Sequence, residues 1–142
     1  MRPSREVSKI ERGGVNWRAM PRQAFRFNMA TIQLSQIAVG RSGDKGNHAN
    51  IGVVAHTAAG YEFLAGELTA ERVAEYFAGL GASRVERFEL PRLWALNFVL
   101  YDCLAGGASR SLRIDTQGKL LGTAIGELTL PSPPRLAEML AT

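Results

Sequence analysis

Two apolar runs with different patterns flank a polar stretch in the first half of the chain. Residues 31–39 alternate apolar and polar side chains, with one slip near Ser35, which predicts a half-buried strand. Residues 50–55 form a short run rich in β-branched side chains, which predicts a buried strand. The stretch between them is polar and contains three glycines, so we expect it to be a loop.

The next segment predicts two helices. Residues 57–66 are typical of a short helix or a single helical turn. A clearer helix begins at Thr69, whose hydroxyl can cap a first-turn N–H, and ends at Gly81, which favours a left-handed stop. Its apolar positions recur at helical spacing: Val73, Tyr76, Phe77 and Leu80.

Strand and helix patterns compete in the centre of the chain. Residues 84–90 alternate apolar and charged side chains and predict a strand that ends at Pro91. Residues 94–105 place apolar side chains at helical spacing and predict a helix that stops at Gly106. Their β-branched and aromatic content keeps a strand open as the alternative.

The last third of the chain predicts shorter elements. We expect a strand over residues 109–115, a turn over 115–118, a helix over 119–126 and a closing strand over 128–130, with one or two helical turns in 135–141. The connections are too short for repeated parallel crossovers. The pattern therefore predicts a small α+β sandwich, with about four mainly antiparallel strands and two principal helices on one face.

Charge is distributed unevenly along the 142 residues. Residues 1–28 carry seven basic and two acidic side chains, whereas residues 29–142 carry ten basic and eleven acidic ones, a net charge of −1. A domain of that charge lacks the electrostatic footprint of a nucleic-acid-binding protein. No apolar run reaches the roughly 20 residues that span a bilayer, so we expect neither nucleic acid nor a membrane as partner.

The sequence predicts one globular domain with two flanking segments. We expect residues 1–28 to be a basic leader that is disordered or precedes the true start, because Met29 stands directly before the first strand. Residues 29–131 are the predicted domain, and residues 132–142 a tail or short helix. Cys103 is the only cysteine and lies in an apolar run, so we expect a core position, a reducing cytoplasmic compartment, no disulfide and no metal site.

The polar stretch between the first two predicted strands holds the densest candidate chemistry. Arg41 can grip a carboxylate or phosphate with two donors, and Lys45 offers a point charge. Asp44 could orient one of these cations, and His48 could exchange protons near neutrality. A P-loop is excluded because Lys45 precedes Gly46 rather than following it. The alternative interpretation is a turn held together by salt bridges among Arg41, Asp44 and Lys45.

Three polar residues further along the chain are also candidates. Asn97 interrupts an apolar stripe and must be hydrogen-bonded if buried, so it either ties a helix to the sheet or faces a pocket. Arg113 and Asp115 would share one face of a strand, either as part of a site or in cross-strand ion pairs on an edge.

Six blocks of residues carry more information together than any one of them alone. They are Arg41–Gly46 with Asn50–Val53, Leu68–Val73, Leu90–Pro91, Ala95–Val99, Gly106–Gly107, and Ser111–Asp115 with Gly118–Lys119. In order and register they resemble the signature of the small ferredoxin-like domain of the acyclic terpene utilisation (AtuA-like) proteins. The resemblance covers residues 32–130 and implies a ferredoxin-like fold.

The resemblance also selects site residues. It implies a ligand-binding set, and His48 lies outside the family pattern. If the domain is itself catalytic, Asp44 and Lys45 would be the acid/base pair. The ligand-binding set is Arg41, Ser42, Gly43, Gly46, Asn50, Asn97, Arg113, Asp115 and Lys119.

In AtuA-like proteins this unit typically follows a much larger domain, or is similar to a separate small protein that partners one. The resemblance implies catabolism of acyclic terpenes such as citronellol or geraniol and of branched acids, as acyl-CoA intermediates. Our leading hypothesis is therefore an accessory domain or subunit that presents the polar stretch to an acyl-CoA or carboxylate shared with a larger AtuA-like partner. The alternatives are a self-contained enzyme acting on a branched acyl-CoA as a homo-oligomer, and a structural interaction module.

Overall fold

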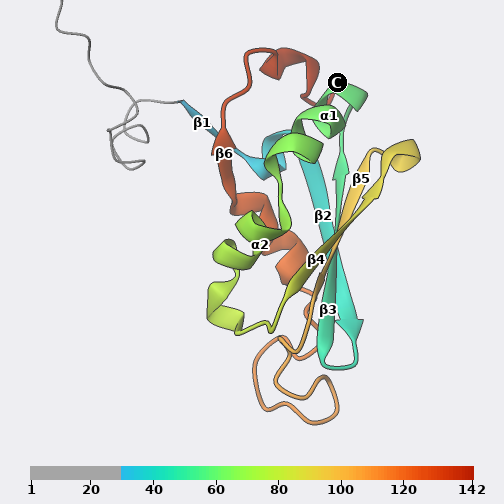
Figure 1. Ribbon diagram of the computed structural model, residues 1–142, viewed down its shortest axis with the longest axis vertical. Coiled ribbons are helices and arrows are strands. Elements are labelled where there is room, and N and C mark those ends of the chain that lie inside the picture. Colours follow the sequence, from blue (N-terminus) through green and yellow to red (C-terminus); the bar gives the residue numbers. More distant parts are fainter. Residues whose placement is uncertain (1–29) are drawn as a thin grey trace, which may run out of the picture.

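The computed structural model describes residues 30–142, which are built around an antiparallel sheet of four strands (Figure 1). Its strands, in the order β2-β3-β5-β4, are β2 (Ala38–Lys45), β3 (His48–Ala55), β5 (Ala95–Leu100) and β4 (Val85–Leu90). A second sheet pairs β1 (Thr31–Gln33) with β6 (Thr129–Pro131), so that buried Ile32 opposes buried Leu130.

The helices lie on one face of the four-stranded sheet, and no helix of residues 30–142 covers its other face (Figure 1). They are α1 (Ala58–Glu67), α2 (Ala70–Tyr76) and α3 (Leu121–Ala124). Short 3₁₀ helices occur at Leu34–Gln36, Ala78–Leu80, Pro91–Leu93, Ile125–Glu127 and Leu136–Glu138. The predicted α+β sandwich, with antiparallel strands and helices on one face, is confirmed.

Threonine hydroxyls begin the two longer helices. Thr57 accepts a hydrogen bond from the Gly60 N–H over 3.0 Å, and Thr69 accepts one from the Arg72 N–H over 3.2 Å. Each bond satisfies one of the free N–H groups of the first helical turn. Gly81 stops the segment after α2 with a φ of 67°, as the sequence predicted.

Alternate residues of the two central strands build the core. Ile51 opposes Phe98 and Val53 opposes Leu96, and all four side chains are buried against the helices. Successive side chains of a strand point to opposite faces, so the residues between them must face the uncovered side of the sheet. That side therefore carries Asn50, Gly52 and Val54 from β3, and Asn97 and Val99 from β5.

The polar stretch is not the predicted loop. Residues 40–45 belong to β2 and residues 48–50 to β3, and only Gly46 and Asn47 form the turn between them. Gly46 has a φ of 69°, which a two-residue hairpin turn requires and glycine adopts without strain. The prediction was wrong because these polar side chains belong to an edge strand of the sheet, where several of them are exposed to solvent, and not to a connection between strands.

Two further predictions are corrected. Residues 94–105 form no helix, and the strand alternative is right, because Leu96, Phe98 and Leu100 alternate into the core as β5. Residues 109–115 form no strand and belong to a series of turns with positive φ at Gly107, Asp115 and Gly118. The sequence there alternates as a strand does, but no neighbouring strand is available to pair with it. Its two apolar side chains, Leu112 and Ile114, are therefore fully exposed.

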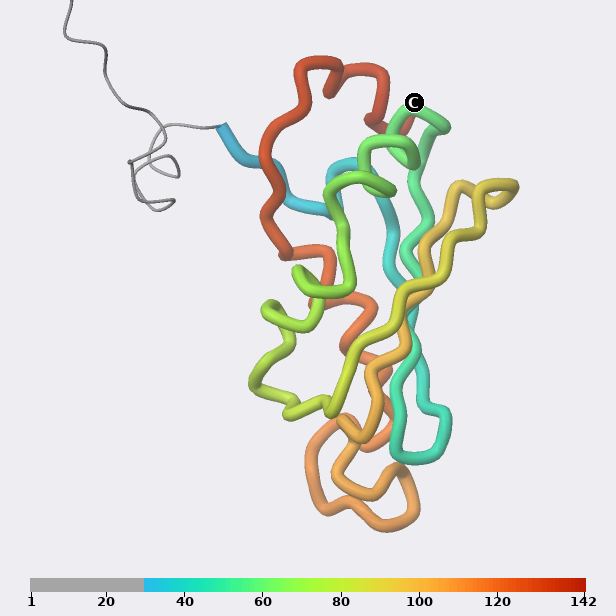
Figure 2. Tube along the Cα trace, viewed as in Figure 1, coloured from blue at the N-terminus to red at the C-terminus, as the bar shows by residue number. Residues whose placement is uncertain are grey.

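The first predicted strand is divided in two. The slip noted near Ser35 coincides with the 3₁₀ turn that separates β1 from β2. Figure 2 shows residues 101–120 as a long connection that extends past the end of the sheet, beside the β2–β3 turn. The prediction for residues 1–28 lies outside the described residues. No helix in the described part of the chain is both long and apolar enough to cross a membrane.

Candidate functional site

A shallow hollow of about 340 Å³ lies over β2 and β3, toward the end of the sheet near their turn. The register pairs Arg41 with Gly52 and Gly43 with Asn50, and these residues share the uncovered face. The hollow is lined by Arg41, Ser42, Gly43, Asp44, Lys45, Asn50, Gly52 and Lys119. Most of the polar stretch is thus gathered at one place, together with Lys119 from far along the chain.

Two glycines leave room for this hollow. Gly43 and Gly52 lie on neighbouring strands and place no side chain on the uncovered face. A Cβ at Gly43 would lie 3.2 Å from the Nζ of Lys119, closer than a side chain normally tolerates. The ammonium of Lys119 therefore rests against the backbone of β2. Gly52 was not among the predicted site residues, although a glycine inside a β-branched run is a known signal for such an opening.

Hydrogen bonds from side chains to the backbone hold the turn that carries Lys119 in this position. The hydroxyl of Ser42 donates to the carbonyl of Gly118 over 2.5 Å and accepts from the N–H of Gly122 over 2.7 Å. The carboxylate of Asp115 accepts from the N–H of Lys119 over 2.6 Å and from the N–H of Leu120 over 3.0 Å. Asp115 therefore closes the turn that carries Lys119, and Ser42 fastens that turn to the edge strand β2.

An amide pair joins the hollow to the centre of the sheet. The Nδ2 of Asn50 donates to the Oδ1 of Asn97 over 2.9 Å, across the pairing of β3 with β5. Asn97 was expected to tie a helix to the sheet or to face a pocket. It instead ties one strand to the next, beside the hollow.

The hollow is electropositive. Arg41, Lys45 and Lys119 line it with a single carboxylate, that of Asp44, which leaves a formal charge of +2. Among residues 30–142, no ion pair within 4.0 Å involves any of these four side chains. The alternative of a salt-bridged turn is therefore wrong, and three cations remain available to a ligand.

The family model of the AtuA ferredoxin-like domain matches residues 32–131. The chain belongs to this family. The match covers both sheets except for Thr31, and it includes every residue that lines the hollow. No curated protein and no solved structure shows a significant match. The resemblance seen in the sequence is thus confirmed at the level of the domain.

Four of the predicted site residues of this AtuA ferredoxin-like domain lie outside the hollow, and one of them is Asn97, which ties β3 to β5 beside it. Gly46 forms the hairpin turn, and Arg113 donates from Nη1 to the carbonyl of Cys103 over 3.4 Å. Arg113 and Asp115 line a separate cavity of about 50 Å³ beneath the 101–120 connection. They share no strand face, because no strand forms there. Asp115 still influences the hollow, through its hydrogen bond to the backbone of Lys119.

Asp44 and Lys45, the predicted acid/base pair, are consecutive residues of β2. Both line the hollow, but side chains of consecutive strand residues leave the backbone in opposite directions. A catalytic role for this pair in the AtuA ferredoxin-like domain stays a prediction.

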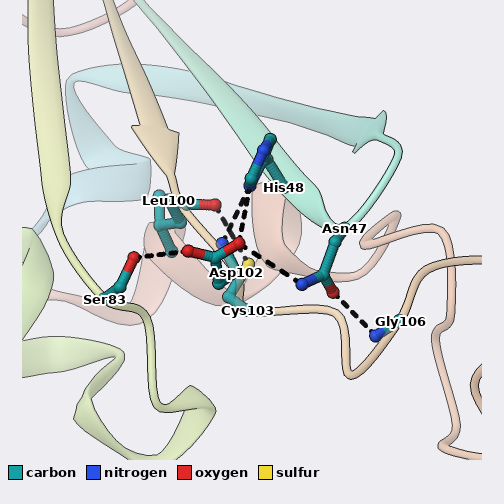
Figure 3. A network of polar contacts seen from close by, with 7 residues as sticks. All are labelled: Asn47, His48, Ser83, Leu100, Asp102, Cys103 and Gly106. Atoms are coloured by element: carbon teal, nitrogen blue, oxygen red, sulfur yellow. Dashed lines mark hydrogen bonds and ion pairs between the residues drawn. The ribbon is translucent and has the colours of Figure 1, made fainter.

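A polar network that the sequence did not reveal anchors the β2–β3 turn of the domain (Figure 3). The Nδ1 of His48 accepts from the backbone N–H of Asp102 over 2.9 Å, and Ser83 donates to the Asp102 carboxylate over 2.7 Å. The side-chain oxygen of Asn47 accepts from the N–H of Gly106 over 2.7 Å. With one ring nitrogen committed to a backbone N–H, His48 fastens the hairpin to the 101–107 segment.

Cys103 lies in the core, as predicted. Its side chain is completely buried and donates from Sγ to the carbonyl of Leu100 over 3.3 Å. Burial raises the pKa of the thiol, so the neutral form predominates at neutral pH. Within the described residues, no cluster of three or more His, Cys, Asp or Glu side chains is placed to hold a metal ion.

Proposed function

We propose that this AtuA ferredoxin-like domain is an accessory domain or subunit that binds an anionic ligand and presents it to a larger AtuA-like partner. The observation that carries the proposal is that three cationic side chains and one carboxylate line a hollow whose base is formed by two glycines, Gly43 and Gly52. Arginine and lysine donors bind carboxylates and phosphates through charge-assisted hydrogen bonds, which are stronger than neutral ones. The family context makes an acyl-CoA or a branched carboxylic acid of terpene catabolism the natural ligand.

A row of apolar side chains next to the hollow supports the docking part of the proposal. Val39, Val54, Ala95 and Leu90 follow one another across all four strands in register. Val39 is 53% exposed, Val54 42% and Leu90 40%, while the small Ala95 between them is buried. Exposed apolar patches of this kind mark interaction sites on soluble proteins. A partner that covers this row would also close over the hollow, because Val39 and Val54 lie two residues from Arg41 and Gly52.

Anion binding is tested by thermal shift and calorimetry with acetate, methyl phosphate and coenzyme A. We expect the anions to raise the melting temperature of the wild-type chain, and Arg41→Ala and Lys45→Ala to reduce that shift. Arg92→Ala is the matched control, because Arg92 is exposed in the 3₁₀ turn after β4, outside the hollow. An equal shift in all variants, or none in the wild type, would contradict the proposal.

Docking is tested by co-expression with a tagged larger AtuA-like protein from the same organism. We expect the two chains to co-purify, and Val54→Asp to abolish the complex without unfolding the domain, since Val54 is exposed. Leu112→Asp is the control, because it places the same charge at an exposed leucine outside the uncovered face. Turnover of a branched acyl-CoA by the purified chain alone would contradict the accessory role and favour a self-contained enzyme.

A further inference from the structure

We propose that the group bound in the hollow is the dianionic phosphate of a phosphate ester rather than a carboxylate. This inference rests on the proposed function, because it identifies the ligand class of the same site. It follows from the number of uncompensated charges around the hollow and from their arrangement about a single glycine.

The charge balance favours a dianion. Three cations and one carboxylate leave a formal charge of +2. A carboxylate or a sulfate ester carries one negative charge and would leave one cation without a counterion. A phosphate monoester carries nearly two at pH 7.5, because its second pKa is about 6, and it would neutralise the hollow.

The three cations are centred on Gly43. Arg41 and Lys45 lie two positions before and after it on the same strand, so all three residues face the uncovered side. Lys119 approaches from the neighbouring turn, with its Nζ 3.2 Å from where a Cβ of residue 43 would be. An anion seated over Gly43 would therefore meet a donor from three directions.

This arrangement matches the shape of a phosphate. A phosphate ester has three terminal oxygens that each accept hydrogen bonds, one for each cation. A carboxylate has two oxygens in one plane, which a single guanidinium satisfies. The absence of a Cβ at Gly43 lets a tetrahedral group approach the backbone of β2 closely.

The test is calorimetric titration of the full chain with methyl phosphate, methyl sulfate and acetate at pH 7.5 and constant ionic strength. Methyl sulfate has the shape of methyl phosphate with one charge fewer. We expect methyl phosphate to bind about tenfold more tightly than either monoanion.

A single variant then tests whether Lys119 produces the preference for phosphate over sulfate. Lys119→Gln removes one charge and keeps most of the side chain, and we expect it to abolish most of the preference for phosphate over sulfate. Arg92→Ala should leave that preference unchanged. Acetate or methyl sulfate binding as tightly as methyl phosphate would overturn the phosphate inference and leave anion binding intact, whereas no binding of any of the three would overturn both. A preference that survives in Lys119→Gln would also contradict the inference.

Discussion

The hydroxyl of Ser42 accepts a hydrogen bond from the backbone N–H of Gly122 over 2.7 Å, which joins residues 80 positions apart in the sequence. The same hydroxyl donates to the carbonyl of Gly118 over 2.5 Å. These two bonds hold the turn that carries Lys119 against the edge of β2. Ser42, which follows Arg41 on β2, therefore positions Lys119, the third cation of the hollow.

Replacing Ser42 with alanine should weaken both the fold and the site. We expect Ser42→Ala to lower the free energy of unfolding by about 1–2 kcal/mol, because it leaves the N–H of Gly122 without its partner. Methyl phosphate should also bind more weakly, because Lys119 is no longer held over Gly43. Urea denaturation and calorimetry measure the two effects.

Ser83→Ala is the matched control for this substitution. The Ser83 hydroxyl is exposed and donates to the Asp102 carboxylate, away from the hollow. We expect little change in methyl phosphate binding and a smaller loss of stability. Equal effects of the two substitutions on binding would show that Ser42 does not position Lys119.

Gly122 should tolerate no side chain. A Cβ there would lie 2.7 Å from the Cα of Arg41 and from the N of Ser42, and these backbone atoms cannot rotate away. We expect Gly122→Ala to destabilise the protein by about 2–3 kcal/mol, as overpacking against a fixed strand does. Thermal and urea denaturation would show the loss.

Gly66 provides the contrasting substitution. It lies in α1, and no heavy atom of the surrounding chain is within 4 Å of the place that a Cβ would occupy, so alanine meets open space. We expect Gly66→Ala to raise the free energy of unfolding by about 0.5–1 kcal/mol, since alanine is the better helix former. Comparable stability changes in both glycine variants would contradict the close packing of α3 on β2.

The sequence predicted elements well where local chemistry decides them. Thr69 and Gly81 mark the limits of the α2 segment through a hydroxyl cap and a left-handed glycine, and both act within a few residues of the chain. For β5 the first prediction was a helix, because Leu93, Leu96 and Leu100 satisfy helical spacing by coincidence. Only the neighbouring strands β3 and β4 decide that residues 95–100 are extended.

The site was predicted in part for the same reason. Arg41, Lys45 and Asn50 were identifiable because they are close together in the sequence, and the hairpin keeps them close in space. No local pattern could place Lys119 beside Gly43, since nothing in the sequence indicates that Ser42 binds the turn that carries it. Arg113 was misplaced because alternation predicted a strand where no neighbouring strand exists to pair with it.

Acid should weaken the start of α2 through Glu71. Hydrogen bonds from its own backbone N–H and from Thr69 hold the pKa of this carboxyl below its usual value. The stabilisation is therefore present above about pH 4.3, the ordinary glutamate pKa, and is lost as the pH falls through the lower folded-state value. We expect Glu71→Gln to be less stable than the wild type at pH 7 and the difference to shrink below about pH 4 in urea titrations. Glu75→Gln, in the last turn of the same helix, is the matched control, and an equal pH-dependent difference there would contradict the role of the cap.

The buried thiol of Cys103 should lower the stability of the fold at alkaline pH, whereas Glu71 lowers it in acid. Burial raises its pKa, so the unfolded chain releases the thiol proton first as the pH rises above about 8.5. Stability from this group is complete below that pH and declines as the pH rises through the folded-state pKa. We expect iodoacetamide at pH 7.5 to leave the native chain unmodified and to alkylate it fully in denaturant, as mass spectrometry would show for the one cysteine present. Rapid alkylation of the native protein would mean that the 101–120 connection opens readily and exposes the core beneath it.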